Sequence, residues 1–268
     1  MEQVKKLREM TGAGVMDCKK ALEASSGDLD KAIEFLRHKG IASASKREDR
    51  QAKEGMILIQ ASGDKAAMIE LNCETDFVAR TDDFQKLAAE LVAKLFESGE
   101  KILTDQSVLD RVRELSGKVG EKMVFSRGSL FEQKQGFVAS YLHSNKKIGV
   151  LVALEASGAD EQVQRFGKDV AMQIAASRAN FVSRQDIPAE MLEREKELFR
   201  GEIPNKPREI QEKIITGKIE KWYEQICLLD QVFIRDQNQK VKDYLAQVIK
   251  ATGQAIAVRR FVRFELGK

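Results

Sequence analysis

The sequence predicts an α+β fold in which helices and antiparallel strands occupy separate stretches of the chain. The first forty residues contain short amphipathic segments separated by glycine, which is typical of a three-helix bundle. Two later stretches each carry a pair of strand segments followed by an amphipathic helix, and another carries two amphipathic helices around a proline loop. The predicted divisions are a three-helix domain at 1–41, a linker at 42–54, an N-terminal core subdomain at 55–136, a C-terminal core subdomain at 137–184 plus 232–268, and an inserted antiparallel helical (coiled-coil) hairpin at 185–231.

The three N-terminal helices are predicted from apolar spacing and from the residues that end them. Apolar residues three apart, up to Met10, share one face, and the run 11–14 ends this helix because glycine tolerates left-handed backbone. A second helix covers 16–24. Asp28 is a candidate N-cap for a third helix, which Gly40 is expected to end. A unit this small is marginal alone, so we expect it to lean on a partner or on the rest of the chain.

The core is predicted to contain one architectural unit twice, namely a hairpin backed by a helix. The first unit continues into a helix whose apolar face begins at Phe84, and the second into a helix whose apolar face begins at Val163. The duplication rests on the order of elements and not on residue identity. A terminal strand at 259–266 is expected to join the sheet of the second hairpin. The hairpin strands are predicted at 56–60, 66–72, 137–142 and 148–154.

The helical hairpin is predicted from heptad spacing on both sides of a loop. Met191 and Leu198 lie seven residues apart, as do Leu192 and Phe199, and the loop at 203–207 breaks the helix because proline lacks an amide donor. The second helix has a seam for a partner helix, with spacings that alternate between four and three. Its residues are Ile215, Ile219, Trp222, Ile226 and Leu229.

The charge balance does not favour nucleic acid as a partner. The formal net charge is +3, so no domain-wide positive field is expected. The basic residues of 42–54 could contact RNA, but this polar segment lacks an apolar stripe and favours a solvated, partly helical linker.

The sequence also gives expectations about compartment. Three distant cysteines do not favour a disulfide framework. The N-terminus lacks a signal-peptide core, and the longest aliphatic run, 148–154, is far shorter than the roughly 20 residues of a membrane span. We expect a cytoplasmic protein with no membrane contact.

The sequence contains no complete motif for catalysis, for a cofactor or for a metal. The Gly-Lys pairs at 117–118 and 217–218 lack the other residues of a phosphate-binding loop, so no direct nucleotide contact is expected. The cysteines and the two histidines have no zinc-ligand spacing. Glu70, Glu74 and Asp76 lie near one strand end, but no histidine completes an acid/base set. We therefore expect a protein without cofactor or metal that is not an enzyme.

The loop after the second strand has an unusual composition. Phe77 and Val78 stand between Asp76 and Arg80, in what should be a surface turn. Such an apolar pair either packs back into the core or is offered to a partner. The residues alone favour packing into the core and leave the second possibility open.

Two motifs resemble the signatures of the elongation factor Ts family. One is the loop Asn-Cys-Glu-Thr-Asp-Phe-Val at 72–78. The other is the N-terminal run at 7–22, which 27–32 continues in the manner of ubiquitin-associated-like domains. His143 and the run 260–265 are also similar to that family, so the resemblance spans nearly the whole chain in the same order.

The resemblance implies a guanine nucleotide exchange factor that binds the GTPase elongation factor Tu and promotes GDP release. In the family, the Asp-Phe of the loop enters the GTPase domain near its Mg²⁺ site, and the N-terminal helices grip the same domain. A histidine of the second hairpin approaches the GTPase's third domain, and the helical hairpin serves contacts with the partner or with a second copy, as a homodimer. The partner-binding residues that the resemblance implies here are Arg8, Met16, Lys19, Lys20, Thr75, Asp76, Phe77, Val78 and His143.

Two other interpretations stay open. A ubiquitin-associated-like adaptor with a different protein client would explain the first forty residues but not the loop motif. A thiol enzyme that uses Cys73 beside Glu74 competes with a small buried residue that closes a strand. One departure from the family is Ile234-Arg235, where relatives can carry an apolar pair, so a partner contact through Arg235 is in doubt.

Overall fold

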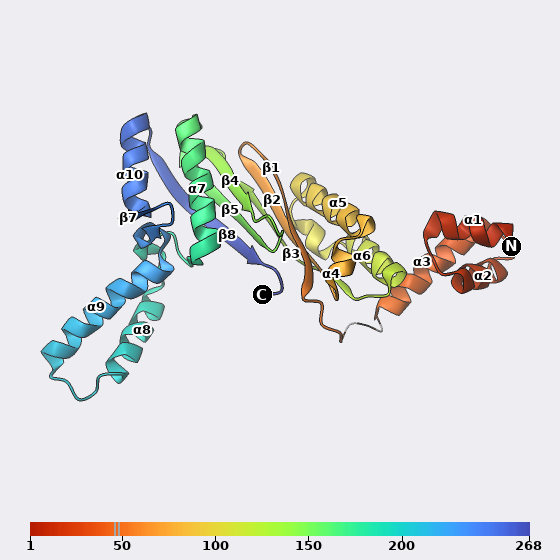
Figure 1. Ribbon diagram of the computed structural model, residues 1–268, viewed down its shortest axis with the longest axis horizontal. Helices are drawn as coiled ribbons and strands as arrows, with labels where there is room; N and C mark the ends of the chain where they lie inside the picture. The colour runs from red at the N-terminus through yellow and green to blue at the C-terminus, as the bar shows by residue number, and fades with distance from the viewer. Residues whose placement is uncertain (46, 48) are drawn as a thin grey trace.

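The computed structural model describes residues 1–45, 47 and 49–268, and it confirms the α+β class. Figure 1 shows two sheets in the centre with helices outside each of them, three short helices at one end and a helical hairpin at the other. The domain boundaries given above stay a prediction, and positions 46 and 48 of the expected linker lie outside the described residues.

The first sheet is antiparallel with the strand order β1-β2-β3. β1 (Glu54–Ser62) and β2 (Lys65–Cys73) form the predicted hairpin, and β3 (Met123–Glu132), which was not predicted, pairs with β2. The helices α5 (Asp82–Ser98) and α6 (Gln106–Val119) cover the outer face of this sheet. The first core that they enclose includes Leu71, Phe84, Leu87, Leu91 and Val112.

The second sheet has the order β4-β5-β8, which confirms that the terminal strand joins the second hairpin. It contains β4 (Gly136–Leu142), β5 (Ile148–Ala156) and β8 (Ile256–Glu265). Its outer face is covered by α7 (Glu161–Ser177) and by α10 (Val241–Thr252), which was not among the predicted elements. The second core includes Val152, Phe166, Val170, Ile174 and Val248.

The two sheets pack face to face through a third apolar cluster. Gly149 lets them approach closely, since a Cβ there would lie 2.6 Å from Ile57 Cγ2 and 2.6 Å from Met68 Sδ. The Ile57 amide donates a hydrogen bond of 2.8 Å to the Lys146 carbonyl, so β1 is tied to the β4–β5 turn. The cluster includes Ile57, Met68, Val138, Leu151 and Phe264.

The N-terminal unit consists of α1 (Glu2–Thr11), α2 (Val15–Ala24) and α3 (Leu29–Ser45). The glycine stop of the first helix is confirmed, because Gly12 is left-handed and donates to the Arg8 carbonyl. The small core of the unit contains Leu7, Cys18, Ala21, Leu22 and Ala32.

The prediction that Gly40 ends the third helix is wrong, because α3 continues beyond it and crosses α6. At the crossing Gly40 meets Gly117, where an added Cβ would lie 2.4 Å from Gly40 Cα. The ion pair between Arg37 and Glu114 lies at the same crossing. A glycine costs a helix interior about 1 kcal/mol relative to alanine, and the contact with α6 offsets that cost.

The helical hairpin contains α8 (Ala189–Gly201) and α9 (Arg208–Ile226). Two details of the predicted seam are wrong. Met191 and Leu198 are exposed, because the face of α8 that meets α9 is rotated by one residue, and Leu229 packs with the second core. The contact between the helices is made by Leu192, Phe199, Ile215, Ile219 and Trp222.

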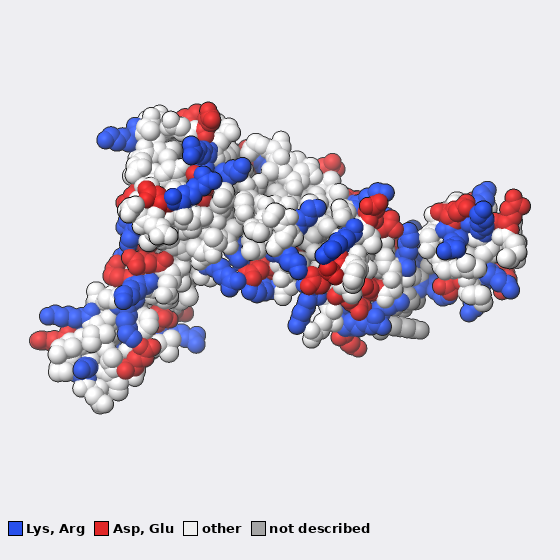
Figure 2. Space-filling view, viewed as in Figure 1, with Lys and Arg blue, Asp and Glu red and all other residues white. Residues whose placement is uncertain are grey.

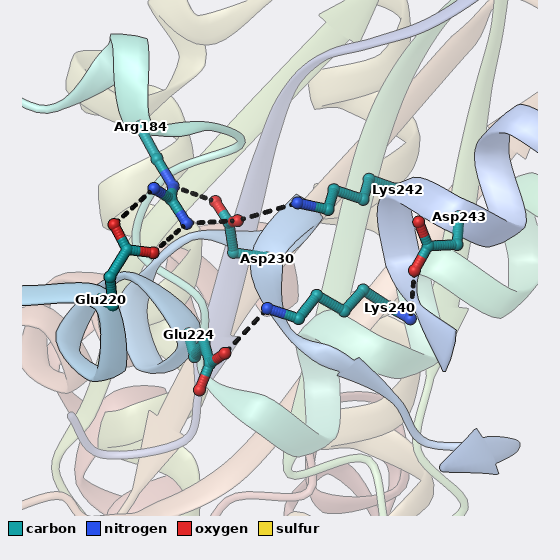
Figure 3. A network of polar contacts seen from close by, with 7 residues as sticks. All are labelled: Arg184, Glu220, Glu224, Asp230, Lys240, Lys242 and Asp243. Atoms are coloured by element: carbon teal, nitrogen blue, oxygen red, sulfur yellow. Dashed lines mark hydrogen bonds and ion pairs between the residues drawn. The ribbon is translucent and has the colours of Figure 1, made fainter. Parts of the chain in front are cut away.

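A polar network joins the base of this hairpin to the rest of the molecule (Figure 3). Arg184 binds both oxygens of Asp230 at 2.9 Å, and both oxygens of Glu220 in α9 at 2.9 and 2.8 Å. Lys240 binds Glu224 at 2.7 Å. The short elements of the chain are β6 (Val232–Phe233), β7 (Asp236–Lys240) and the 3₁₀ helices Glu100–Thr104, Arg184–Asp186 and Leu228–Asp230.

Charged side chains of both signs are mixed over the face shown in Figure 2. None of the helices in the described part of the chain is long and apolar enough to cross a membrane. Within the same residues, no three or more His, Cys, Asp or Glu side chains are grouped so that they could hold a metal ion.

Candidate functional site

The loop after β2 forms a single helical turn, α4 (Asp76–Ala79). Thr75 has extended backbone and caps this turn, because its Oγ1 accepts a hydrogen bond of 3.4 Å from the Val78 amide. The Arg80 amide closes the turn on the Asp76 carbonyl at 3.2 Å. The residues that the sequence singled out therefore adopt a defined structure.

The turn separates the apolar pair. Phe77 is 79% exposed, whereas Val78 packs against the first core and Ala79 is buried beside it. Successive residues of a helix point about 100° apart, so the turn can direct Val78 inward while Phe77 points outward. The preference for packing into the core is therefore wrong for Phe77 and correct for Val78.

Asp76 lies beside Phe77 and binds Arg80 at 2.7 Å in an i,i+4 pair. Both side chains are in contact with solvent, and exposed pairs of this kind contribute little, in the range of about 0–1 kcal/mol. The Asp76 carboxylate is thus accessible for another partner at small cost.

Two carboxylates clamp the base of the turn to the segment between α6 and β3. Glu121 accepts from the Thr75 amide at 3.0 Å and from the Thr75 hydroxyl at 2.6 Å. In the opposite direction, Glu74 accepts from the Lys122 amide at 2.6 Å and from Arg50 at 3.2 Å. The Lys122 amide, and then Arg50, lower the pKa of Glu74 below its usual value, so this group stays an acceptor. The sequence motifs gave no indication of Glu121.

The carboxylates considered as an acid/base set are not brought together. Glu70 is buried and binds Arg127 at 2.6 Å and the Gly267 amide at 2.9 Å, whereas Glu74 and Asp76 have the separate partners described above. This arrangement satisfies each carboxylate individually and leaves no shared proton.

Cys73 lies at the end of β2 and is fully buried. Burial, followed by the negative charge of Glu121, raises the pKa of its thiol to about 12. The Sγ atom lies 3.1 Å from the Thr75 carbonyl, to which the S–H group donates. A protonated, buried thiol is a poor nucleophile, so the geometry does not support the thiol-enzyme interpretation.

All four N-terminal candidates are exposed. Arg8 lies in the last turn of α1, and Met16, Lys19 and Lys20 lie on α2, where Met16 is 63% exposed. Lys19 pairs with Glu23 at 3.9 Å. Two further apolar residues near the turn between α1 and α2 are exposed. They are Met10 (56%) and Val15 (47%). For Met10 this differs from the prediction, because spacing alone placed it on the inner face.

An open cleft of about 510 Å³ separates the three-helix unit from α5 and α6. Its lining includes Met10, Asp17, Leu36, Lys86 and Lys118. Lys118 binds Asp83 of α5 at 2.8 Å on the core side of this cleft. Met10 and the end of α6 thus border the same cleft, whereas Arg8, Met16, Lys19 and Lys20 do not line it.

His143 lies on the β4–β5 turn of the second sheet, whereas Phe77 follows a strand of the first. Its Nδ1 lies 3.0 Å from Asn145 Oδ1, and the ring meets Tyr141 edge to face with centroids 6.3 Å apart. His143 is therefore a half-buried residue of a separate region.

Arg235 belongs to the pair Ile234-Arg235, at which the sequence departs from the family that it resembles. Its side chain forms an ion pair within the chain. Its guanidinium binds the buried carboxylate of Asp169 at 3.0 Å. Asp169 also accepts from the Tyr244 hydroxyl at 3.0 Å.

Comparison with known proteins identifies relatives over the whole chain. The family model described as Elongation factor TS matches residues 74–268. Elongation factor Ts of Aquifex aeolicus is 44% identical over 287 residues, which cover 100% of this chain and 97% of that protein. The same factor of Prosthecochloris aestuarii is 43% identical over 282 residues, with 99% and 98% covered, and that of Clostridium botulinum is 40% identical over 280 residues, with 100% and 92% covered.

Proposed function

The chain belongs to the elongation factor Ts family, a family of translation elongation factors, and on that premise we propose that it binds elongation factor Tu and promotes the release of GDP. The observation that carries this proposal is the ring of Phe77, which is 79% exposed on a capped turn next to the Asp76 carboxylate. A large aromatic residue with an adjacent charge is the usual composition of an interface anchor.

Exchange of this kind requires no chemistry from the factor, only a preference for the nucleotide-free partner. Each ~1.4 kcal/mol of that preference changes nucleotide affinity tenfold, and the coupling is reciprocal. Burial of one phenylalanine contributes about 1.5–3 kcal/mol. Mg²⁺ is held by few protein ligands, so insertion of Asp76 and Phe77 near it would weaken the nucleotide.

The other candidate residues are assigned supporting contacts in the same complex. Arg8, Met16, Lys19 and Lys20 would bind the GTPase domain from the three-helix unit, and His143 would bind its third domain. In this proposal the factor uses no cofactor, metal or nucleotide of its own. It would act in the cytoplasm, where translation takes place.

The helical hairpin is proposed to contact the partner or a second copy of the chain. Its exposed apolar residues include Met191 and Leu198. Nucleic acid has no role in this proposal. An adaptor role for the three-helix unit alone would leave the exposed Phe77 unexplained.

The test is the release of a fluorescent GDP analogue from purified elongation factor Tu. We expect Phe77→Ala to reduce the stimulated rate by roughly 10- to 100-fold, since the lost burial is about 1.5–3 kcal/mol. Its Tm should match that of the wild type, because the ring is exposed. Val232→Ala, at a 49% exposed apolar residue of β6 that has no role in the proposed contacts, is the matched control. An unchanged rate with Phe77→Ala would refute the proposed role.

A further inference from the structure

Every hydrogen-bonding group of Thr75 is used. The amide and hydroxyl both donate to Glu121, at 3.0 and 2.6 Å. The hydroxyl oxygen accepts from the Val78 amide at 3.4 Å, and the carbonyl accepts from Cys73 Sγ at 3.1 Å and from the Ala79 amide at 3.3 Å. Because the Thr75 hydroxyl donates its hydrogen bond to Glu121, the lone pairs of that oxygen are left to face the Val78 amide. Glu121 therefore fixes the cap that sets the orientation of α4.

Glu121 is itself held by the end of α6. Gly120 adopts a left-handed conformation with φ of 80° and donates to the Ser116 carbonyl at 3.0 Å. The buried Ser116 hydroxyl then donates to the Glu121 carbonyl at 2.6 Å. The return contact from the Lys122 amide to Glu74, at 2.6 Å, holds the same two segments together. The base of the turn is thus bound in both directions.

We propose that Glu121 is a positioning residue for nucleotide exchange, which orients α4 so that Phe77 projects outward while Val78 packs inward. This rests on the proposed function, because the orientation matters only if Phe77 meets a partner. The rotation of the turn matters, since turning it by one residue, about 100°, would bring Phe77 to the inward direction that Val78 now takes. An acceptor that binds two donors of one residue suits this purpose, because it restricts rotation as well as distance.

The experiment compares Glu121→Ala with Asp105→Ala in the full chain. Asp105 caps the opposite end of α6, where its Oδ1 accepts from the Ser107 amide at 2.8 Å, so its loss also weakens α6 without touching the turn. We expect Glu121→Ala to lower the GDP-release rate at saturating factor about tenfold, equivalent to about 1.4 kcal/mol, with a much smaller change in the concentration for half-maximal rate. Glu121→Gln, which retains one acceptor oxygen, should lose less of the GDP-release rate. Asp105→Ala should stimulate GDP release at the wild-type rate.

Hydrogen exchange of the free protein provides a second readout that needs no partner. In Glu121→Ala the amides of Thr75, Val78 and Ala79 should exchange faster, while those of Asp105→Ala stay at wild-type rates. Unchanged protection of these amides would show that Glu121 does not hold the base of the turn. If the amides of Glu121→Ala exchange hydrogen faster but its GDP-release rate equals that of the wild type, in an assay where Phe77→Ala is defective, only the positioning role would be overturned. If Phe77→Ala also stimulated GDP release at the wild-type rate, the exchange role of Glu121 would be refuted together with the proposed function. The hydrogen-exchange result would still show whether Glu121 holds the base of the turn.

Discussion

Glu265, near the end of β8, collects several basic side chains. It binds Lys268, Arg263 at 2.8 Å and Arg178, the C-cap of α7, at 3.1 Å. The hydrogen bonds from Lys268 and then from Arg263 lower the pKa of this carboxyl to about 2, although partial burial acts in the opposite direction. The terminal strand is thereby linked to the helix that covers it.

This shift predicts a pH-dependent contribution to stability. Because the pKa is lower in the folded state, the contribution is complete above the ordinary value of 4.5 and is lost as the pH falls toward 2. We expect Glu265→Gln to lower Tm at neutral pH, and the difference from the wild type to shrink between pH 4.5 and 2. Thermal melts across this range test it, with Glu190→Gln, at an exposed position of α8, as the control. A difference that stayed constant with pH would contradict the assignment.

At the scale of elements, the crossing of α3 and α6 fixes the N-terminal unit against the first sheet. It depends on Gly117, because a Cβ there would lie 2.4 Å from Gly40 Cα and 2.5 Å from the Gly40 carbonyl oxygen. Both obstructing atoms belong to the backbone, so they cannot move aside as the end of a flexible side chain could. The two helices must separate if Gly117 gains a side chain, whereas a Cβ on Gly40 would lie 3.7 Å from the Glu114 carbonyl oxygen, which is an ordinary contact.

Alanine substitution should therefore have opposite effects at two helical glycines. Gly117→Ala is expected to destabilise the protein by about 1–3 kcal/mol through overpacking. Gly217→Ala, in α9 with no atom within 4 Å of the added Cβ, should stabilise it by about 1 kcal/mol through helix propensity. Denaturant melts measure both changes, and limited proteolysis near residue 40 should be faster only in the first variant. Equal stability of the two variants would show that the crossing is loosely packed.

The sequence pattern predicted elements where one face is buried along the whole segment. It failed for β3 because a bulge opposite Glu70 and Leu71 changes the parity of this strand. Phe125 packs into the first core from an odd position and Leu130 from an even one, so alternation does not persist. In contrast, Val241, Leu245 and Val248 have helical spacing, so the pattern is consistent with α10, although α10 was not among the predicted elements.

The sequence pattern also could not predict how the residues of the candidate site are oriented. The residues 75–78 were identified from sequence. The resemblance implied a partner contact for Phe77, but the residues alone did not give its outward direction. Their orientation depends on a carboxylate 46 positions away in the chain, that of Glu121. Local spacing carries no information about such a contact.

At the scale of the molecule, Arg184 joins the helical hairpin to the body of the protein. Arg184 binds Asp230 below the hairpin and Glu220 within it, and its guanidinium lies 4.5 Å from the ring centre of Tyr223 (Figure 3). These hydrogen bonds, first those with Asp230, raise the pKa of Arg184 above its usual value, so the charge persists at all accessible pH. A planar group that binds two carboxylates restrains an angle, which a lysine cannot do.

We therefore expect Arg184→Ala to broaden the range of hairpin directions. Spin labels on cysteines at Lys134 and Leu198, both exposed, would report the distance between the body and the hairpin. Arg200→Ala removes an exposed pair with Glu212 inside the hairpin and should leave the distribution narrow. An equally narrow distribution in Arg184→Ala would show that packing alone sets the direction.

The glycine crossing also bears on avidity. Gly117 lies four positions before Glu121, so the end of α6 carries both the three-helix unit and the turn of Phe77. A protein that touches one of these surfaces meets the other at a preset spacing, and the second contact becomes intramolecular with a high effective concentration. Two individually weak patches can then act as a single strong one, and cutting the chain between them would remove this gain without altering either patch.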